Sequence, residues 1–260
     1  MIKVESVSEA SKLVFENMKS GVLTNHVMSP EEYKSDIAVG VLSAYTWPGG
    51  LVFLRGREGY QILSYFITDT EIPLDIDIPE NTVVEIVSKP SGAEAAGIVV
   101  RYWEWVGLKP MLKRIRLTRP SGVSSVEGDR VFVASEQDTG GCDKLIRASF
   151  DPVTGHIPDY HELSSSIKAG HVLCLKDSEG VVCGLLRVLL RAASVEIRQL
   201  ALREDMRGRG LSRNLLDAFI KKWGDRKSTV WMKDSYVPAF RTYATAGFTV
   251  DGWCSHVLTT

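Results

Sequence analysis

Apolar and polar residues alternate along one segment in the last third of the chain, but the alternation changes step within it. The apolar residues fall first on odd and then on even positions: Val195, Ile197, Leu200 and Leu202. Successive side chains of a β-strand point to opposite faces, so this change predicts a strand with a β-bulge near Arg198 and Gln199. A bulge would separate the strand from its neighbour and free backbone groups for a ligand. A strand buried first on one face and then on the other would give the same pattern.

After this strand the apolar spacing becomes helical from Leu211 to Trp223. The window from residue 198 to 213 holds five arginines against two acids, and two glycines precede the helix. Unpaired N–H groups of a first helical turn bind anions, and glycine lets a phosphate approach closely. A diphosphate site is therefore expected at Arg207, Gly208, Arg209, Gly210, Leu211 and Ser212. The alternative is a solvated basic turn whose glycines only cap the helix.

The first half of the chain carries a helical pattern, then strand patterns, then a helix and a strand. Ser8 and Ser29 are expected to cap the first two helices, the first of them over residues 8–18. Strands are predicted at residues 51–54, 60–67, 82–87 and 112–117, and a third helix at 91–106.

Residues 119–128 are small and polar and contain a proline, which is typical of an interdomain linker. The predicted domains are therefore residues 1–118 and 129–260. In the second domain strands are expected at 130–134, 172–176, 181–190, 195–202, 228–233 and from 248, and helices at 143–150, 158–167, 211–223 and 238–246. The two halves share their order of elements without a visible repeat of residues. This order predicts an α+β fold, with a mixed, mostly antiparallel, twisted sheet flanked by helices in each half.

Composition limits the partners. The 31 Lys and Arg residues nearly balance the 32 Asp and Glu residues, so the overall charge gives no attraction to nucleic acid or to an anionic membrane. With neither a signal-peptide pattern nor a membrane-spanning apolar run, a cytoplasmic protein is expected. The five histidines show no metal-ligand spacing, so no metal is predicted.

Four cysteines are too few for a disulfide framework in a chain of this length. A tight turn near Ser178 would place Cys174 opposite Cys183 on neighbouring strands. A small apolar pair is the favoured interpretation, and a cross-strand disulfide is the alternative.

Tyr243 lies four residues before Gly247, a residue expected to end the last helix. A phenol, with a reference pKa of about 10, is protonated at neutral pH and can donate a proton to a thiolate, whose reference pKa is about 8.5. The alternative is a tyrosine at the edge of the core.

These residues resemble the GCN5-related N-acetyltransferases (GNAT). The resemblance rests on Leu200-Ala201-Leu202, on residues 207–212, which fit Arg/Gln-x-x-Gly-x-Gly/Ala with Ser212 in the last place, and on Tyr243 with Gly247-Phe248. It implies a tandem acyl-CoA N-acyltransferase-like fold, with acetyl-CoA as cosubstrate. The pantetheine arm would pair with backbone around Leu200, Ala201 and Leu202, and the pyrophosphate would bind at residues 207–212. Tyr243 would protonate the leaving thiolate.

The resemblance also implies a carboxylate base on the central strand, where Glu196 is the only candidate; an ion-paired, solvated role beside Arg187 or Arg198 is the alternative. Many family members carry an asparagine where this chain has Asp234-Ser235-Tyr236, and Ser235 could replace that CoA contact. In the first half, residues 87–92 occupy the expected place of the phosphate loop without its glycine pattern. That half is expected to be a degenerate, non-catalytic copy.

The predicted function is transfer of an acetyl or short acyl group from CoA to a primary amine of a small molecule or peptide, by a monomer or homodimer. Two alternatives remain open: a regulatory protein that binds acyl-CoA without turnover, and a tandem-fold transferase that uses aminoacyl-tRNA. Glu162 and Asp159 are the nearest candidates for an acidic acceptor pocket.

Overall fold

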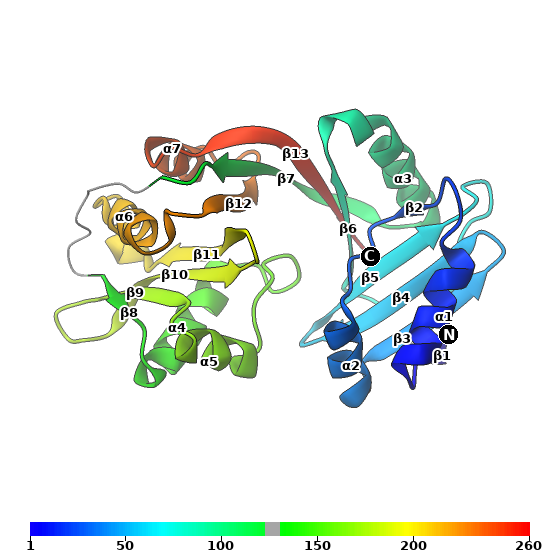
Figure 1. The fold of residues 1–260 in the computed structure, drawn as a ribbon, viewed down its shortest axis with the longest axis horizontal. Helices are drawn as coiled ribbons and strands as arrows, with labels where there is room; N and C mark the ends of the chain where they lie inside the picture. Colours follow the sequence, from blue (N-terminus) through cyan, green and yellow to red (C-terminus); the bar gives the residue numbers. More distant parts are fainter. Residues whose placement is uncertain (123–130) are drawn as a thin grey trace. The chain divides into compact units, whose positions relative to one another are not determined.

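The computed structural model describes residues 1–122 and 131–260, so residues 123–128 of the expected linker lie outside the described residues. The chain forms two compact units (Figure 1). Unit 1 comprises Met1–Lys113 and Trp253–Thr260, and unit 2 comprises Arg114–Gly252.

Unit 1 has two helices on one face of its sheet and one helix on the other. Its elements are β1 (Ile2–Lys3), α1 (Val7–Asn17), β2 (Leu23–Thr24), α2 (Pro30–Ala38), β3 (Leu42–Trp47), β4 (Gly50–Arg57), β5 (Tyr60–Ile67), β6 (Thr82–Ser88), α3 (Ala93–Val106) and the start of β7 (Lys109–Arg119). The strand order is β1-β3-β4-β5-β6-β13, and β2 pairs with β5. One core packs below α1 and α2 around Phe53 and Phe66, and the other packs below α3 around Trp103.

Unit 2 repeats this arrangement with more helix. Its elements are β8 (Phe132–Val133), α4 (Thr139–Ser149), α5 (Tyr160–Lys168), β9 (Val172–Lys176), β10 (Val182–Leu190), β11 (Ser194–Leu202), α6 (Leu211–Trp223), β12 (Lys227–Lys233), α7 (Val237–Thr245) and the start of β13 (Thr249–Thr259). The strand order is β7-β12-β11-β10-β9-β8. Helices α6 and α7 cover one face and α4 and α5 the other (Figure 1).

The strand pairing within each unit is mostly antiparallel, with parallel pairing between β5 and β6 and between β11 and β12. The predicted mixed α+β fold is confirmed. Helix α6 has the bounds that its apolar periodicity predicts, and Ser29 forms a capping box with Glu32 at the start of α2. The cap of α1 was predicted wrongly: Ser6, not Ser8, accepts the N–H of Glu9 at 3.1 Å. Strand β3 was not predicted.

The last strand of each half pairs with a strand of the other half. Residues 114–119 of β7 pair with β12 in unit 2, although β7 is the last strand of the first half in sequence. Residues 254–259 of β13 pair with β6 in unit 1. Each unit is therefore completed by a strand that belongs to the other half in sequence.

Helices α2 and α5 begin 130 positions apart (160 − 30), and α1 and α4 begin 132 apart (139 − 7). Ile2 pairs with Ala44, and Phe132 pairs with Cys174. Both residues of the second pair thus lie 130 positions after those of the first (132 − 2 and 174 − 44). The same shift relates Gly40 to Gly170, which end α2 and α5 at the same φ of 70°. The register of the first strands and the end of the second helix therefore repeat between the two halves.

The cysteines do not form the expected cross-strand pair. Cys174 pairs with Leu185, and the register shift between Val182 and Gly184 makes Cys183 an extra residue in β10. Cys174 is buried beneath α4 and α5, whereas Cys183 lies in the core beneath α6. All four cysteines are free.

Candidate functional site

The β-bulge predicted in β11 is present. Arg187 of β10 pairs with Gln199 and the next residue, Val188, pairs with Ile197, so Arg198 is the extra residue. Val195 and Ile197 belong to the core beneath α6, and Leu200 and Leu202 pack against the same core. Ala201 faces the opposite core, beneath α4 and α5. The change of parity in the sequence therefore reflects the extra residue and not a change of buried face.

A split opens between β11 and β12 at this bulge. Their parallel pairing runs from Ser194 with Lys227 to Ile197 with Val230. Beyond it, β11 continues to Leu202 along β10, and β12 continues to Lys233 along β7. On the side of β11 that faces away from β10, no strand of residues 1–122 and 131–260 pairs with residues 198–202. Backbone groups on that edge can therefore receive an extended ligand.

The loop after β11 leads into α6 through two glycines with left-handed backbones. Gly208 has φ 74° and Gly210 has φ 78°, and a Cβ at either position would meet no atom within 4 Å. Gly210 is the N-cap of α6, without a side-chain cap. Among the described residues, no hydrogen bond uses the N–H groups of residues 208–212. The helix start thus offers open donors to an anion.

Some of the five arginines near this loop form ion pairs with carboxylates and others do not. Three are held by carboxylates: Arg198 by Glu196, Arg203 by Asp177 and Asp205, and Arg213 by Asp217. Arg207 and Arg209 are exposed, and neither is ion-paired within the described part of the chain. Arg207 donates to the carbonyl of Leu202 at 3.2 Å. The cationic excess at the helix start is therefore Arg207 and Arg209.

Glu196 lies on β11 two residues before the bulge, with its side chain 14% exposed. Arg198 Nη1 donates to one carboxylate oxygen at 2.7 Å, and Arg191 Nη2 lies 3.9 Å from the other. Of the two partners considered from sequence, Arg198 is the one that Glu196 contacts. Both carboxylate oxygens thus have a guanidinium neighbour.

Tyr243 is buried in the core beneath α6 and α7, with 6% of its surface exposed. Its ring packs edge-on against Phe248 at 5.5 Å between centroids. Burial raises the pKa of Tyr243 well above its usual value. Its hydroxyl makes no hydrogen bond to another described residue. Ser235 is exposed in the turn before α7.

A buried polar cluster on the α4/α5 face was missed from sequence. Arg187, 3% exposed, donates to Gln199 at 2.9 Å, to Ser166 at 3.2 Å and to Glu162. Burial lowers the pKa of Arg187, and Glu162 opposes that shift. Gln199 also donates to the carbonyl of His156 at 3.0 Å. Only the polarity of Arg187 and Gln199 within otherwise apolar strands could have indicated this cluster.

Of the two acids expected for an acceptor pocket, Glu162 is therefore neutralised by Arg187. Asp159 is exposed, and its carboxylate caps α5 by accepting the N–H of Glu162 at 2.7 Å. Neither acid is an unengaged carboxylate.

Residues 143–248 match the family model described as the Acetyltransferase (GNAT) family. This segment is a GNAT-family domain by its sequence pattern. It contains the bulged strand, the glycine loop, α6 and Tyr243, but not the first half of the chain. No match to a curated protein sequence is found.

Solved structures resemble the whole chain and show its fold. A GCN5-related N-acetyltransferase from Sphaerobacter thermophilus is 14% identical, with a TM-score of 0.60 over 89% of this chain and 85% of that one. A GNAT acetyltransferase from Colwellia psychrerythraea is 11% identical, with a TM-score of 0.59 over 99% and 98%. A tandem GNAT protein from the clavulanic acid biosynthesis pathway is 10% identical, with a TM-score of 0.57 over 100% and 97%. The two halves of this chain thus form a tandem GNAT-like fold.

Two further observations concern possible partners of the described residues. None of their helices is both long and apolar enough to cross a bilayer. Nor do they contain a cluster of His, Cys, Asp or Glu side chains arranged to hold a metal ion.

The structure corrects the expected position of the degenerate phosphate loop. In unit 2 the glycine loop follows β11, and the equivalent strand of unit 1 is β5, because each pairs in parallel with the next strand. The equivalent segment is therefore residues 68–81, not 87–92. It contains no helix, so it cannot present a helix start to an anion.

Proposed function

We propose that this protein transfers an acetyl or other short acyl group from CoA to a primary amine, and that unit 2 binds the acyl-CoA. One observation carries the proposal: the open edge of β11 leads directly into a helix start with unengaged N–H groups. An extended arm that ends in a diphosphate matches both features.

The residues proposed to bind the donor follow from this arrangement. Backbone groups around Leu200, Ala201 and Leu202 would pair with the pantetheine arm, which carries amides. The N–H groups of residues 208–212, with the side chains of Arg207 and Arg209, would hold the pyrophosphate. Ser235, exposed before α7, is proposed as a further contact.

The proposed chemistry is direct attack of the amine nitrogen on the thioester carbonyl. A C–N bond forms, the C–S bond breaks, and the departing thiolate takes the phenolic proton of Tyr243, which later regains one from solvent. A thiolate released in the same apolar surroundings is a stronger base than in water, which favours this transfer. The amine proton passes through a water molecule to Glu196, because the guanidinium groups of Arg198 and Arg191 lie against the carboxylate oxygens and block direct approach of the amine.

The proposed acceptor, a small-molecule or peptide amine, approaches from the α4/α5 face. The side of β10 and β11 that faces α4 and α5 carries Glu196, Arg187 and Gln199. The core beneath α6 lies on the other side of the two strands. Since Arg187 already pairs with Glu162, recognition by hydrogen bonds is expected more than recognition by a free acid.

The test is a calorimetric titration with acetyl-CoA followed by a thiol-release assay over a panel of amines. Binding together with amine-dependent thiol release is the expected result. Binding without release on any amine would indicate an acyl-CoA sensor. Absence of binding would contradict both the acyltransferase and the acyl-CoA sensor, and would favour aminoacyl-tRNA as the donor.

A further inference from the structure

Unit 1 contains the same kind of split between parallel strands as unit 2. Strands β5 and β6 pair only from Gln61 with Thr82 to Leu63 with Val84. Beyond these pairs, β5 continues to Ile67 along β4, and β6 continues to Ser88 along β13. By geometry alone, unit 1 would offer a second cleft for an extended ligand.

That cleft is filled by the chain itself. The short strand β2 pairs antiparallel with Ile67 and Phe66 of β5. The hydroxyl of Thr24 donates to the carbonyl of Tyr65 at 2.6 Å. The backbone edge that is open in β11 is therefore already paired in β5.

Asn25 closes the split by bridging both strands. Its side-chain oxygen accepts the N–H of Tyr65 at 2.9 Å. Its side-chain amide donates to the carbonyl of Leu63 on β5 at 3.2 Å and to that of Glu85 on β6 at 3.0 Å. One asparagine thus replaces three hydrogen bonds that a bound amide-containing ligand could make.

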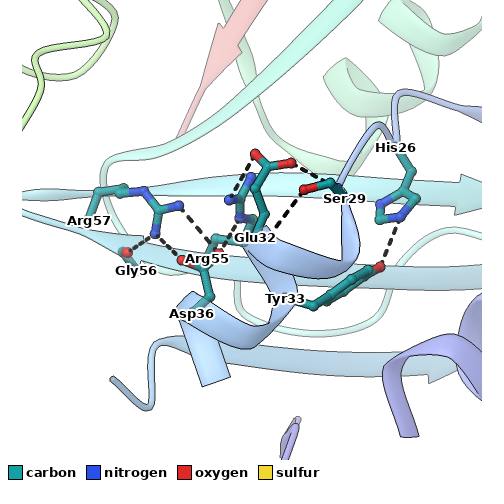
Figure 2. Close-up of polar contacts among 8 residues, drawn as sticks. All are labelled: His26, Ser29, Glu32, Tyr33, Asp36, Arg55, Gly56 and Arg57. Carbon is teal, nitrogen blue, oxygen red and sulfur yellow. Dashed lines mark hydrogen bonds and ion pairs between the residues drawn. The ribbon is translucent and has the colours of Figure 1, made fainter. Parts of the chain in front are cut away.

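The next residue anchors this segment. Figure 2 shows His26 pointing toward Tyr33 of α2, whose hydroxyl lies 2.8 Å from His26 Nε2. The His26 ring also lies 4.9 Å from that of Phe66 and 5.9 Å from that of Phe53, between ring centroids. Packing against α2, β4 and β5 fixes the position from which Asn25 enters the split.

The equivalent loop of unit 2 takes a different path. Counted back from α2 and α5, which begin 130 residues apart, Asn25 corresponds to Gly155, which has no side chain to insert. This loop folds back on itself, because Asp151 Oδ1 accepts the N–H groups of Val153 and Thr154, and the carbonyl of Asp151 accepts the N–H of Gly155. A Cβ at Gly155 would lie 2.5 Å from that carbonyl, so the fold-back requires glycine.

We infer that residues 23–25 are a built-in plug, which occupies in unit 1 the place that a pantetheine arm takes in unit 2, so that each chain binds one acyl-CoA. The stoichiometry rests on the proposed function, whereas the plug rests on the hydrogen bonds of Thr24 and Asn25. The α1–α2 loop closes one cleft, and its α4–α5 counterpart leaves the other open.

Two measurements test this inference. Calorimetry with acetyl-CoA should give one molecule per chain, and hydrogen exchange with the ligand bound should show new protection in residues 198–212 but none in 61–67. Two molecules per chain, or ligand-dependent protection of β5, would overturn it.

A third measurement, on an Asn25 variant, needs no ligand, so it stays decisive if the proposed function fails. Asn25→Ala should raise the exchange rate of the Tyr65 amide about tenfold or more, because it loses its acceptor. Asn17→Ala is the matched control, since Asn17 also donates from its side chain to a backbone carbonyl of unit 1, that of Leu13, at 2.9 Å. Equal exchange of Tyr65 in the wild type and in Asn25→Ala would disprove the plug.

Discussion

The phenol of Tyr243 lies in an apolar core and makes no hydrogen bond within the described part of the chain. Its raised pKa keeps the hydroxyl of Tyr243 protonated through neutral and mildly alkaline pH, as a general acid requires.

We therefore expect Tyr243→Phe to lower turnover on the order of 10²-fold and to leave acetyl-CoA affinity nearly unchanged. Phenylalanine keeps the packing against Phe248, so the loss would report the proton alone. Steady-state kinetics with calorimetry measures both quantities. Unchanged turnover would remove Tyr243 from the mechanism.

His26 gives unit 1 a pH-dependent stability. Burial, followed by the charge of Arg55, lowers its pKa from 6.5 to about 4 in the folded state. Between these values the unfolded chain binds more protons, so stability rises with pH. This contribution is fully present above pH 6.5 and is lost as pH falls towards 4.

His26→Gln keeps a partner for Tyr33 but does not titrate. From pH 7 to pH 5 the wild type should lose about 1–2 kcal/mol more of its unfolding free energy than this variant, measured by urea unfolding of unit 1. His161→Gln, at an exposed position of α5, is the control and should behave as the wild type. The same pH dependence in all three proteins would contradict the assignment to His26.

At the scale of elements, the loop before α6 supplies the next prediction. Arg209→Gln removes an exposed, unpaired cation at the helix start and should raise the acetyl-CoA dissociation constant about three- to tenfold. Lys221→Gln removes one charge at the opposite end of the same helix and should have little effect. Calorimetry at low salt compares the two, and equal effects would mean that only net charge matters.

The sequence predicted those elements whose signal is local. Helix α6 follows from apolar spacing and the bulge from the change of parity between Ile197 and Leu200. Tyr243 and the glycine loop were predicted as site residues from short motifs, and their roles stay predictions. The Arg187–Gln199 cluster was missed because its partners come from β10, β11 and α5, and no periodicity indicates which polar residues meet across strands.

One missed strand explains the misplaced phosphate loop of the first half. Without β3, the three strands predicted before the third helix matched β9, β10 and β11 in order, and β6 took the place of β11. With β3 present, β5 becomes the counterpart of β11. The sequence Leu42–Trp47 contains a serine, a threonine and a tyrosine, so it lacks a continuous apolar run like that of residues 51–54 in β4.

At the scale of the whole chain, the exchanged strands could not be predicted. Ser88 and Cys254 lie side by side although 166 residues separate them. Local patterns predict a strand but not its partner, and the linker composition near residue 120 suggested a division in sequence order. The packing instead assigns the end of the GNAT half, residues 253–260, to unit 1.

This exchange makes the C-terminal strand a support of the first half. Leu258 is fully buried beneath α3 in the core that contains Trp103, so Leu258→Ala should destabilise unit 1 by about 2–5 kcal/mol. Leu117 on β7 is its reciprocal, fully buried in the core of unit 2, and Leu117→Ala should destabilise that unit instead. Native-state hydrogen exchange should show faster opening of β4 in the first variant and of β10 in the second. If Leu258→Ala loosened β10 and spared β4, residues 253–260 would belong with the half that precedes them in sequence.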